Sequence, residues 1–180
     1  MSHTDASPDI CALLTAAATR LRFRPLTAAD LPELKRQFRD PDMCAFHGEA
    51  FTDQYAVDMI ASCATVTPQA GYLRVAITDA GSGEWLGTIG FHFYEPDSQR
   101  AEVGYDIWKE HWNQGYASEA LAALCAVLPT VIPLRELYLL TPQDHSASIA
   151  VAGHNDFSPC APIRDQITPT TAWFHREFSA

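Results

Sequence analysis

Apolar and polar residues alternate with more than one period along this chain, and each period predicts a kind of element. Basic and apolar side chains alternate over residues 20–26, which is typical of a strand with one solvated face. Residues 72–78 and 85–94 are rich in apolar and β-branched side chains and flank a turn at residues 80–83, so we expect a hairpin. Further strands are expected at residues 101–108, 134–141, 157–163 and 171–178.

Apolar residues at spacings of three and four predict helices in the first third of the chain. Residues 31–38 follow this spacing after a capping arrangement of Thr27 with Asp30, and Pro41 is expected to end the helix. A second helix is expected to begin at the cap Thr52, with a buried stripe made of Tyr55, Met59 and Ile60.

Two more helices are expected in the second half of the chain. The longer one covers residues 115–128, and Pro129 and Pro133 are expected to end it. Its apolar face is made of Ala117, Ala120, Leu121, Leu124 and Leu128. The shorter helix is expected at residues 146–153.

The order of these elements, several strands followed by alternating helices and strands, predicts an α+β fold with a mixed sheet. No linker or internal repeat interrupts residues 20–180, so we expect them to form a single domain. Residues 1–19 are expected to be an N-terminal appendage that contains a short helix over residues 10–18, with Asp9 as its cap.

The amino-acid composition indicates the class of protein. The chain has 180 residues, of which 47% are apolar and 19% charged, as in an ordinary globular domain with its own core. No apolar run approaches the roughly 20 residues needed to cross a bilayer. The polar N-terminus lacks the basic and apolar segments of a secretory signal, so we expect a cytoplasmic protein that does not act at a membrane.

Charge and metal-ligating residues exclude further classes. The net charge of −10 opposes nucleic-acid binding and favours a cationic partner, such as an amine. The five cysteines include no C-x-x-C pair, and the seven histidines form no H-E-x-x-H motif. We therefore expect neither a metal site nor a disulfide framework.

The segment around Gly115 carries the strongest chemical signal. A strand leads into a turn that contains Gly115, and the turn opens directly into the long amphipathic helix. The first turn of a helix has unpaired backbone N–H groups and the positive end of the helix dipole, which together bind phosphate groups. Gly115 and Ala117 keep bulky side chains away from such a ligand.

Residues 112–117, Trp-Asn-Gln-Gly-Tyr-Ala, resemble the pyrophosphate-binding signature of the GNAT superfamily, Q/R-x-x-G-x-G/A, in the W-x-x-G-Y-A form of the RimJ/RimL-like branch. Residues 20–26, 87–90 and 144–151 are similar to that branch's opening strand, its central hairpin and its N-x-x-S-x-x-V segment. The resemblance spans residues 20–157. It implies a GNAT-like fold, in which helices flank a mixed, mostly antiparallel central sheet.

The resemblance also implies an activity. It predicts an acetyl-CoA-dependent N-acetyltransferase that moves an acetyl group directly to a primary amine, on a protein N-terminus or a small molecule, as a monomer or homodimer. The alternative is a catalytically silent module of the same fold that binds acyl-CoA as a sensor or assembly part.

The resemblance assigns residues to the coenzyme as well. Main-chain groups along the strand edge from Tyr105 to Ile107 are expected to pair with the pantetheine arm, as an added strand would. His145 stands where the branch usually has an asparagine that contacts the coenzyme. The pyrophosphate is expected on the backbone amides of Asn113, Gln114, Gly115, Tyr116, Ala117 and Ser118.

Catalysis requires a proton acceptor for the amine and a donor for the leaving thiolate. Glu102 is the first candidate for a general base acting through water, with a solvent-facing strand carboxylate as the alternative. His92 is the second candidate, with a packed histidine as the alternative. Ser148 matches the serine that lies near the coenzyme A sulfur, with a serine on the helix surface as the alternative. No tyrosine lies between residues 144 and 157 to take this role.

Besides His145, residues 155–157 and the C-terminal tail depart from the branch. Asn155-Asp156-Phe157 replaces the usual L-G-F, and Asn155 is expected to adopt the left-handed conformation of the missing glycine. The loop at residues 42–50 and the C-terminal strands are expected to border the acceptor groove. The identity of the acceptor amine stays open.

Overall fold

The computed structural model describes residues 9–45, 52–63, 71–163 and 170–179. The helices among these residues are α1 (Ile10–Ala17), α2 (Leu31–Arg39), α3 (Pro41–Cys44), α4 (Asp53–Ser62), α5 (Tyr116–Val131) and α6 (Ser146–His154). The strands are β1 (Leu21–Pro25), β2 (Leu73–Asp79), β3 (Trp85–Glu95), β4 (Arg100–Ile107), β5 (Glu136–Pro142), β6 (Ser158–Pro159) and β7 (Thr171–Glu177).

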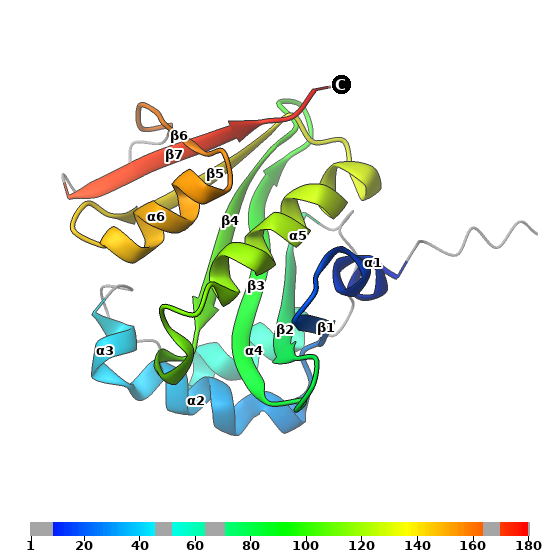
Figure 1. Ribbon diagram of the computed structural model, residues 1–180, viewed down its shortest axis with the longest axis vertical. Coiled ribbons are helices and arrows are strands. Elements are labelled where there is room, and N and C mark those ends of the chain that lie inside the picture. The colour runs from blue at the N-terminus through cyan, green and yellow to red at the C-terminus, as the bar shows by residue number, and fades with distance from the viewer. Residues whose placement is uncertain (1–8, 46–51, 64–70, 164–169, 180) are drawn as a thin grey trace, which may run out of the picture.

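The strands form one sheet in the order β1-β2-β3-β4-β5-β7-β6 (Figure 1). Neighbouring strands are antiparallel except β4 and β5, which run parallel. The described pairing of β4 with β5 covers Arg100 to Val103 against Glu136 to Leu139 and then stops. Beyond it, β4 continues on β3 to Ile107 while β5 continues on β7 to Pro142. The two halves of the sheet therefore separate at the end where α5 and α6 begin.

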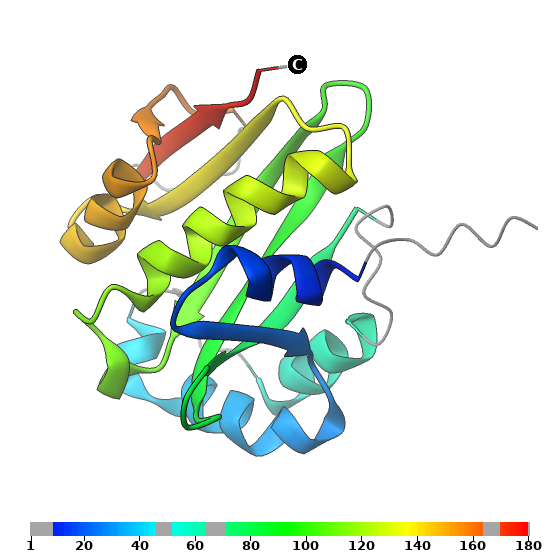
Figure 2. The same cartoon turned by 45° about the vertical axis from the view of Figure 1, so that its right-hand side comes forward.

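Helices cover both faces of the sheet. On one face, α1 lies beside α5, as Figure 2 shows, and their apolar side chains join those of β1 to β5 in the main core. On the other face, a second cluster joins α2 and α4 to the β2 residue Ala76. Strand alternation explains the division, because successive side chains point to opposite faces of the sheet.

The fold class expected from the sequence is confirmed: the protein has a mixed, mostly antiparallel sheet flanked by helices. Asp9 caps α1 as expected, but α1 is no loose attachment, because Ile10 and Leu14 are fully buried in the main core. Residues 1–8 of the expected appendage lie outside the described residues.

Three expected element boundaries are wrong. Pro129 lies within α5, which ends at Val131; so close to the end of the helix, the missing proline N–H removes one hydrogen bond from the last turn only. The strand expected at residues 157–163 is reduced to Ser158–Pro159. Part of the loop expected at residues 42–50 forms α3, because the Asp40 carboxylate accepts hydrogen bonds from the N–H groups of Asp42 and Met43.

Among the described residues, no helix combines the length and the apolar character that crossing a lipid bilayer requires.

Candidate active site

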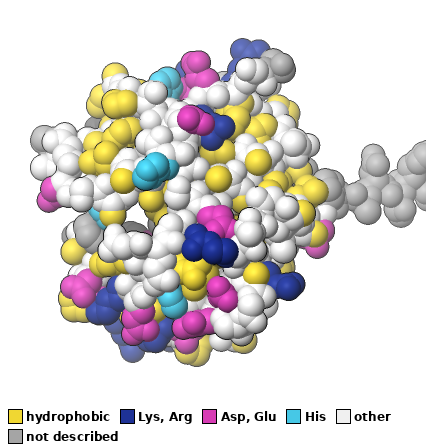
Figure 3. Space-filling view, in the orientation of Figure 1, with side chains coloured by type: hydrophobic (Ala, Val, Ile, Leu, Met, Phe, Trp, Pro, Cys, Tyr) yellow, Lys and Arg dark blue, Asp and Glu magenta, His cyan; other side chains and the backbone are white. Residues whose placement is uncertain are grey.

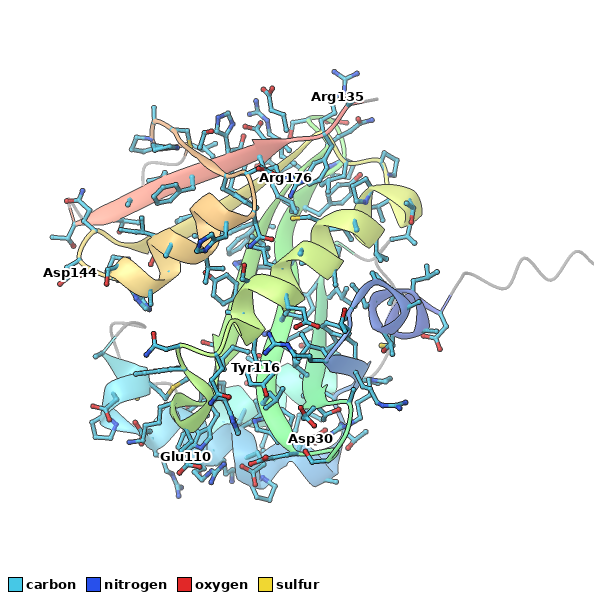
Figure 4. The ribbon with its side chains drawn as sticks, viewed as in Figure 1. Asp30, Glu110, Tyr116, Arg135, Asp144 and Arg176 are labelled. Carbon is cyan, nitrogen blue, oxygen red and sulfur yellow. The ribbon has the colours of Figure 1, made fainter. Side chains whose placement is uncertain are left out.

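A cavity of about 840 Å³ opens where β4 and β5 separate. Its lining comes from the starts of α5 and α6, the separated strand ends, and side chains of α2, α3 and α4. The space-filling view shows the surface hollowed between these elements (Figure 3). In Figure 4, Tyr116 at the start of α5 and Asp144 before α6 lie on opposite sides of this opening, and both line the cavity.

The α5 end of the cavity has the geometry of an anion site. Gly115 is the N-cap of α5 with a φ of +80°, a conformation that strains any other residue. The Glu119 N–H donates to the Gly115 carbonyl at 3.0 Å, so the amides of residues 116–118 precede the first hydrogen bond of the helix. These amides and the helix dipole favour a negatively charged group. Asn113, Gly115, Tyr116, Ala117 and Ser118 all line the cavity.

Arg20, the residue before β1, holds this turn in place. Its Nη1 donates to the Gln114 carbonyl at 2.9 Å, and its guanidinium lies over the Tyr116 ring. Its Nε donates to the Glu119 carboxylate at 2.7 Å. Gln114, expected at the cofactor, is not among the residues lining the cavity, and its side chain donates to the Glu110 carbonyl. The sequence pattern identified Arg20 only as part of a strand with a solvated face.

Arg20 and Glu119 form an ion pair that we call the Arg20–Glu119 clamp. The Glu119 carboxylate also accepts hydrogen bonds from the backbone N–H groups of Thr19 and Arg20, at 2.8 and 2.7 Å. Burial raises the pKa of Glu119, but the hydrogen bonds from Arg20 and Thr19 outweigh burial and leave this pKa below its ordinary value. Glu119 is therefore held as a carboxylate, and the start of α5 is tied to the chain before β1.

The middle of the cavity brings together the predicted Tyr105 and Ser148. Their side-chain oxygens lie 2.9 Å apart, although the residues come from β4 and α6. Burial raises the pKa of Tyr105 to about 12, so its phenol is neutral at physiological pH. His145 is the N-cap of α6, and its Nδ1 accepts from the Ser148 N–H at 3.4 Å. Ile107 lines the same cavity at the end of β4.

The two candidate bases are hydrogen-bonded to each other. His92 and Glu102 are cross-strand partners on β3 and β4, and His92 Nε2 lies 2.9 Å from Glu102 Oε1. Both line the cavity, and their side chains are largely buried. The β3–β4 pairing is irregular after His92, and Phe93 there has a φ of +51°, with its ring edge-to-face with the His92 ring. A strand bulge of this kind redirects side chains.

A buried ion pair missed by the sequence analysis lies next to these bases. The Arg74 guanidinium donates to the Asp106 carboxylate and, at 2.9 Å, to the Thr88 hydroxyl. Gly104 makes room for it, because a Cβ at this position would lie 3.0 Å from Arg74 Nη1. The sequence does not indicate this ion pair, because its residues meet only through the strand register. The register of β2, β3 and β4 places Arg74, Thr88 and Asp106 on one face of the sheet.

The far wall of the cavity is apolar, with Phe38, Met43, Tyr55 and Met59 as its lining residues. They come from α2, α3 and α4, and Met43 belongs to the segment 42–50 that is expected to border the acceptor groove. Lys109 fixes α3 there, with its Nζ 2.6 Å from Asp40 and 3.0 Å from Asp42. The rest of the expected loop, residues 46–50, lies outside the described residues.

The departure at residues 155–157 also has a structural explanation. Asp156, not Asn155, adopts the left-handed conformation, with a φ of +61°. Asn155 is buried instead, and its Nδ2 donates to Ser118 Oγ and to the Val151 carbonyl. The expectation that Asn155 would replace the missing glycine is therefore wrong, and Asn155 ties the end of α6 to the first turn of α5.

Comparisons with known proteins agree on one family. A family model for an acetyltransferase (GNAT) domain matches residues 20–158. The chain is 28% identical over 153 residues to the uncharacterized N-acetyltransferase p20 of Bacillus licheniformis, a match that covers 84% of this chain and 86% of that protein.

Solved structures show the same fold. RimL, a ribosomal L7/L12 alpha-N-protein acetyltransferase solved with coenzyme A, is similar with a TM-score of 0.70 and 18% identity, over 89% of this chain and 96% of that one. Spermidine N-acetyltransferase from Vibrio cholerae, solved with CoA and spermine, is similar with a TM-score of 0.74 and 14% identity, over 88% of this chain and 95% of that one.

Proposed function

The chain belongs to the GNAT acetyltransferase family, and from this premise we propose that it moves an acetyl group from acetyl-CoA directly to a primary amine. The amine belongs to a protein N-terminus or to a small molecule. One observation carries the proposal: a single cavity connects the free amides at the start of α5 with the His92–Glu102 pair.

The residues at the α5 end fit acetyl-CoA. The amides of residues 116–118 bind its pyrophosphate, since Gly115 leaves their approach open. Residues 104–107 of β4 line the cavity beyond Val103, where the pairing of β4 with β5 ends, so we place the amide groups of the pantetheine arm along this part of β4. When bound, acetyl-CoA supplies an activated acetyl thioester.

Glu102 takes the proton of the acceptor amine, directly or through one water. An unperturbed α-amine has a pKa of about 8 and a lysine amine one of about 10.4, so at neutral pH most of the acceptor arrives protonated. His92 holds the Glu102 carboxylate in place through its 2.9 Å hydrogen bond. The expected choice between Glu102 and His92 thus becomes a pair with Glu102 as base and His92 as its partner.

Ser148 acts on the leaving group, whereas Glu102 acts on the amine. Its hydroxyl lies among the residues that line the cavity between α5 and α6, and it donates a hydrogen bond to the departing thiolate. The surrounding charges favour a cationic acceptor, because three carboxylates, those of Glu102, Asp106 and Asp144, line the cavity, whereas Arg74 is the one arginine among its described lining residues.

Incubation of the purified protein with acetyl-CoA and a panel of amines tests this proposal. The panel contains spermidine, single amino acids and peptides with free N-termini, and the readouts are thiol release and the mass of the amine product. We expect thiol release coupled to acetylation of at least one amine. Tight coenzyme A binding by calorimetry, with no acetylated product from any amine, would instead favour a catalytically silent acyl-CoA-binding module.

A further inference from the structure

The contact between Tyr105 and Ser148 joins two elements on opposite sides of the cavity. Tyr105 belongs to the part of β4 that has left β5, and Ser148 belongs to the first turn of α6. Their hydroxyl oxygens are 2.9 Å apart, and both residues line the cavity. The sequence of α6 contains no tyrosine. The fold nevertheless brings a tyrosine hydroxyl to this helix from the neighbouring strand.

The direction of this hydrogen bond follows from the chemistry of the two hydroxyls. A phenol, with an ordinary pKa of about 10, is a far stronger acid than the serine alcohol and therefore the better donor. Burial, together with the nearby Asp106 carboxylate, keeps the Tyr105 phenol protonated. With Tyr105 Oη–H donating to Ser148 Oγ, the serine hydrogen is free to point to a third group.

The remaining contacts of Ser148 hold it in this orientation. Its backbone N–H donates to His145 Nδ1, so the first turn of α6 is capped and the position of Ser148 is fixed. Two titratable groups contact or flank the pair, His145 on α6 and Asp106 next to Tyr105 on β4, and Glu102, Asp144 and His154 line the same cavity. The Asp106 carboxylate is itself neutralised by Arg74.

We propose that Tyr105 is a positioning residue that orients the Ser148 hydroxyl toward the sulfur of coenzyme A. This inference rests on the proposed function, which places Ser148 beside the leaving group. When the carbon–sulfur bond breaks, both bonding electrons stay on the sulfur, and Ser148 stabilises that charge by donating a hydrogen bond. Neither hydroxyl loses its proton, because an ordinary thiol has a pKa of about 8.5, far below that of either hydroxyl. Solvent later protonates the thiolate.

The test measures the pKa of the thiol of bound coenzyme A, which requires no acceptor and no turnover. The ultraviolet absorbance of the thiolate is followed against pH in the saturated complexes of the wild type, Tyr105→Phe, Ser148→Ala and the double variant. Tyr105→Phe keeps the ring that packs on the core. Tyr94→Phe is the matched control, because its hydroxyl donates to the Pro133 carbonyl, and Tyr94 is not among the residues that line the cavity.

We expect Tyr105→Phe and Ser148→Ala each to raise the thiol pKa by about one unit, with no further rise in the double variant and none in Tyr94→Phe. A rise in Ser148→Ala without one in Tyr105→Phe would overturn the positioning role. Equal thiol pKa values in all variants would remove Ser148 from the sulfur as well. A shifted thiol pKa in a protein that acetylates no amine would leave this inference standing and reject the proposed function.

Discussion

The two ends of the cavity are built in different ways. The α5 end comes from one continuous segment, residues 112–119, fixed from outside by Arg20. The opposite end collects Arg74, His92, Glu102 and Asp106 from three strands and adds an apolar wall from three helices. A local segment provides a general anion site, whereas side chains assembled by strand register are free to differ between relatives. This contrast explains why cofactor use is easier to infer here than the acceptor.

The largest expected effect is on the stability of the protein, through the end of the cavity that is assembled from three strands. Arg74→Met leaves Asp106 buried without its cation, and we expect a loss of about 3–5 kcal/mol in the free energy of unfolding. The double variant Arg74→Met with Asp106→Leu is expected to recover most of this loss, because no unpaired charge is left. Urea unfolding measures both variants. A single variant as stable as the wild type would show that the ion pair does not support this end.

The next effect concerns turnover. Glu102→Gln removes the proposed base, and we expect kcat to fall about 100-fold or more with little change in coenzyme A affinity. Glu95→Gln is the matched control, since Glu95 lies on β3 outside the cavity lining and accepts from Ser98. Steady-state rates and calorimetry provide the two readouts. An unchanged kcat and pH–rate profile in Glu102→Gln would exclude the base role.

A smaller effect is expected at the α5 end of the cavity, on the affinity for coenzyme A. Gly115→Val forces a β-branched residue into a φ of +80°, which costs about 1–2 kcal/mol and should weaken coenzyme A binding about tenfold. Gly153→Ala is the control, because this glycine lies within α6 with open space around its Cβ position. If calorimetry gave wild-type affinity for Gly115→Val, the conformation of this turn would not matter for the coenzyme.

The smallest effect concerns pH and the Arg20–Glu119 clamp. Glu119→Gln is expected to cost about 1 kcal/mol of stability at neutral pH. Because the folded-state pKa of Glu119 is depressed, its contribution is present above the unfolded pKa of about 4.3 and is lost as the pH falls through the folded value. Urea unfolding of both proteins should therefore show a difference at neutral pH that shrinks in acid. A constant difference would contradict the clamp.

Much of the fold could be predicted because its elements have clear periods. The alternation of residues 20–26 and the apolar face of residues 115–128 each predicted the right kind of element. Pro129 misled the prediction of the helix end, because a proline in the last turn costs little once the rest of the helix is packed.

The site contains both a part that the sequence predicts and a part that it does not. The turn at Gly115 was predictable because its function depends on adjacent residues. The contacts of Arg74 with Asp106, of Arg20 with Glu119 and of Tyr105 with Ser148 join residues 32 to 99 positions apart in the sequence. Such contacts follow from strand register and helix placement, which a single sequence does not specify.

A crystal structure with a bisubstrate analogue, in which coenzyme A is joined through an acetyl linker to an acceptor amine, tests the central claim most directly. We predict the pyrophosphate within hydrogen-bonding distance of the amides of residues 116–118 and the amine nitrogen within direct or water-mediated reach of Glu102. A pyrophosphate bound elsewhere, or an amine on the side of the cavity away from Glu102, would contradict the account.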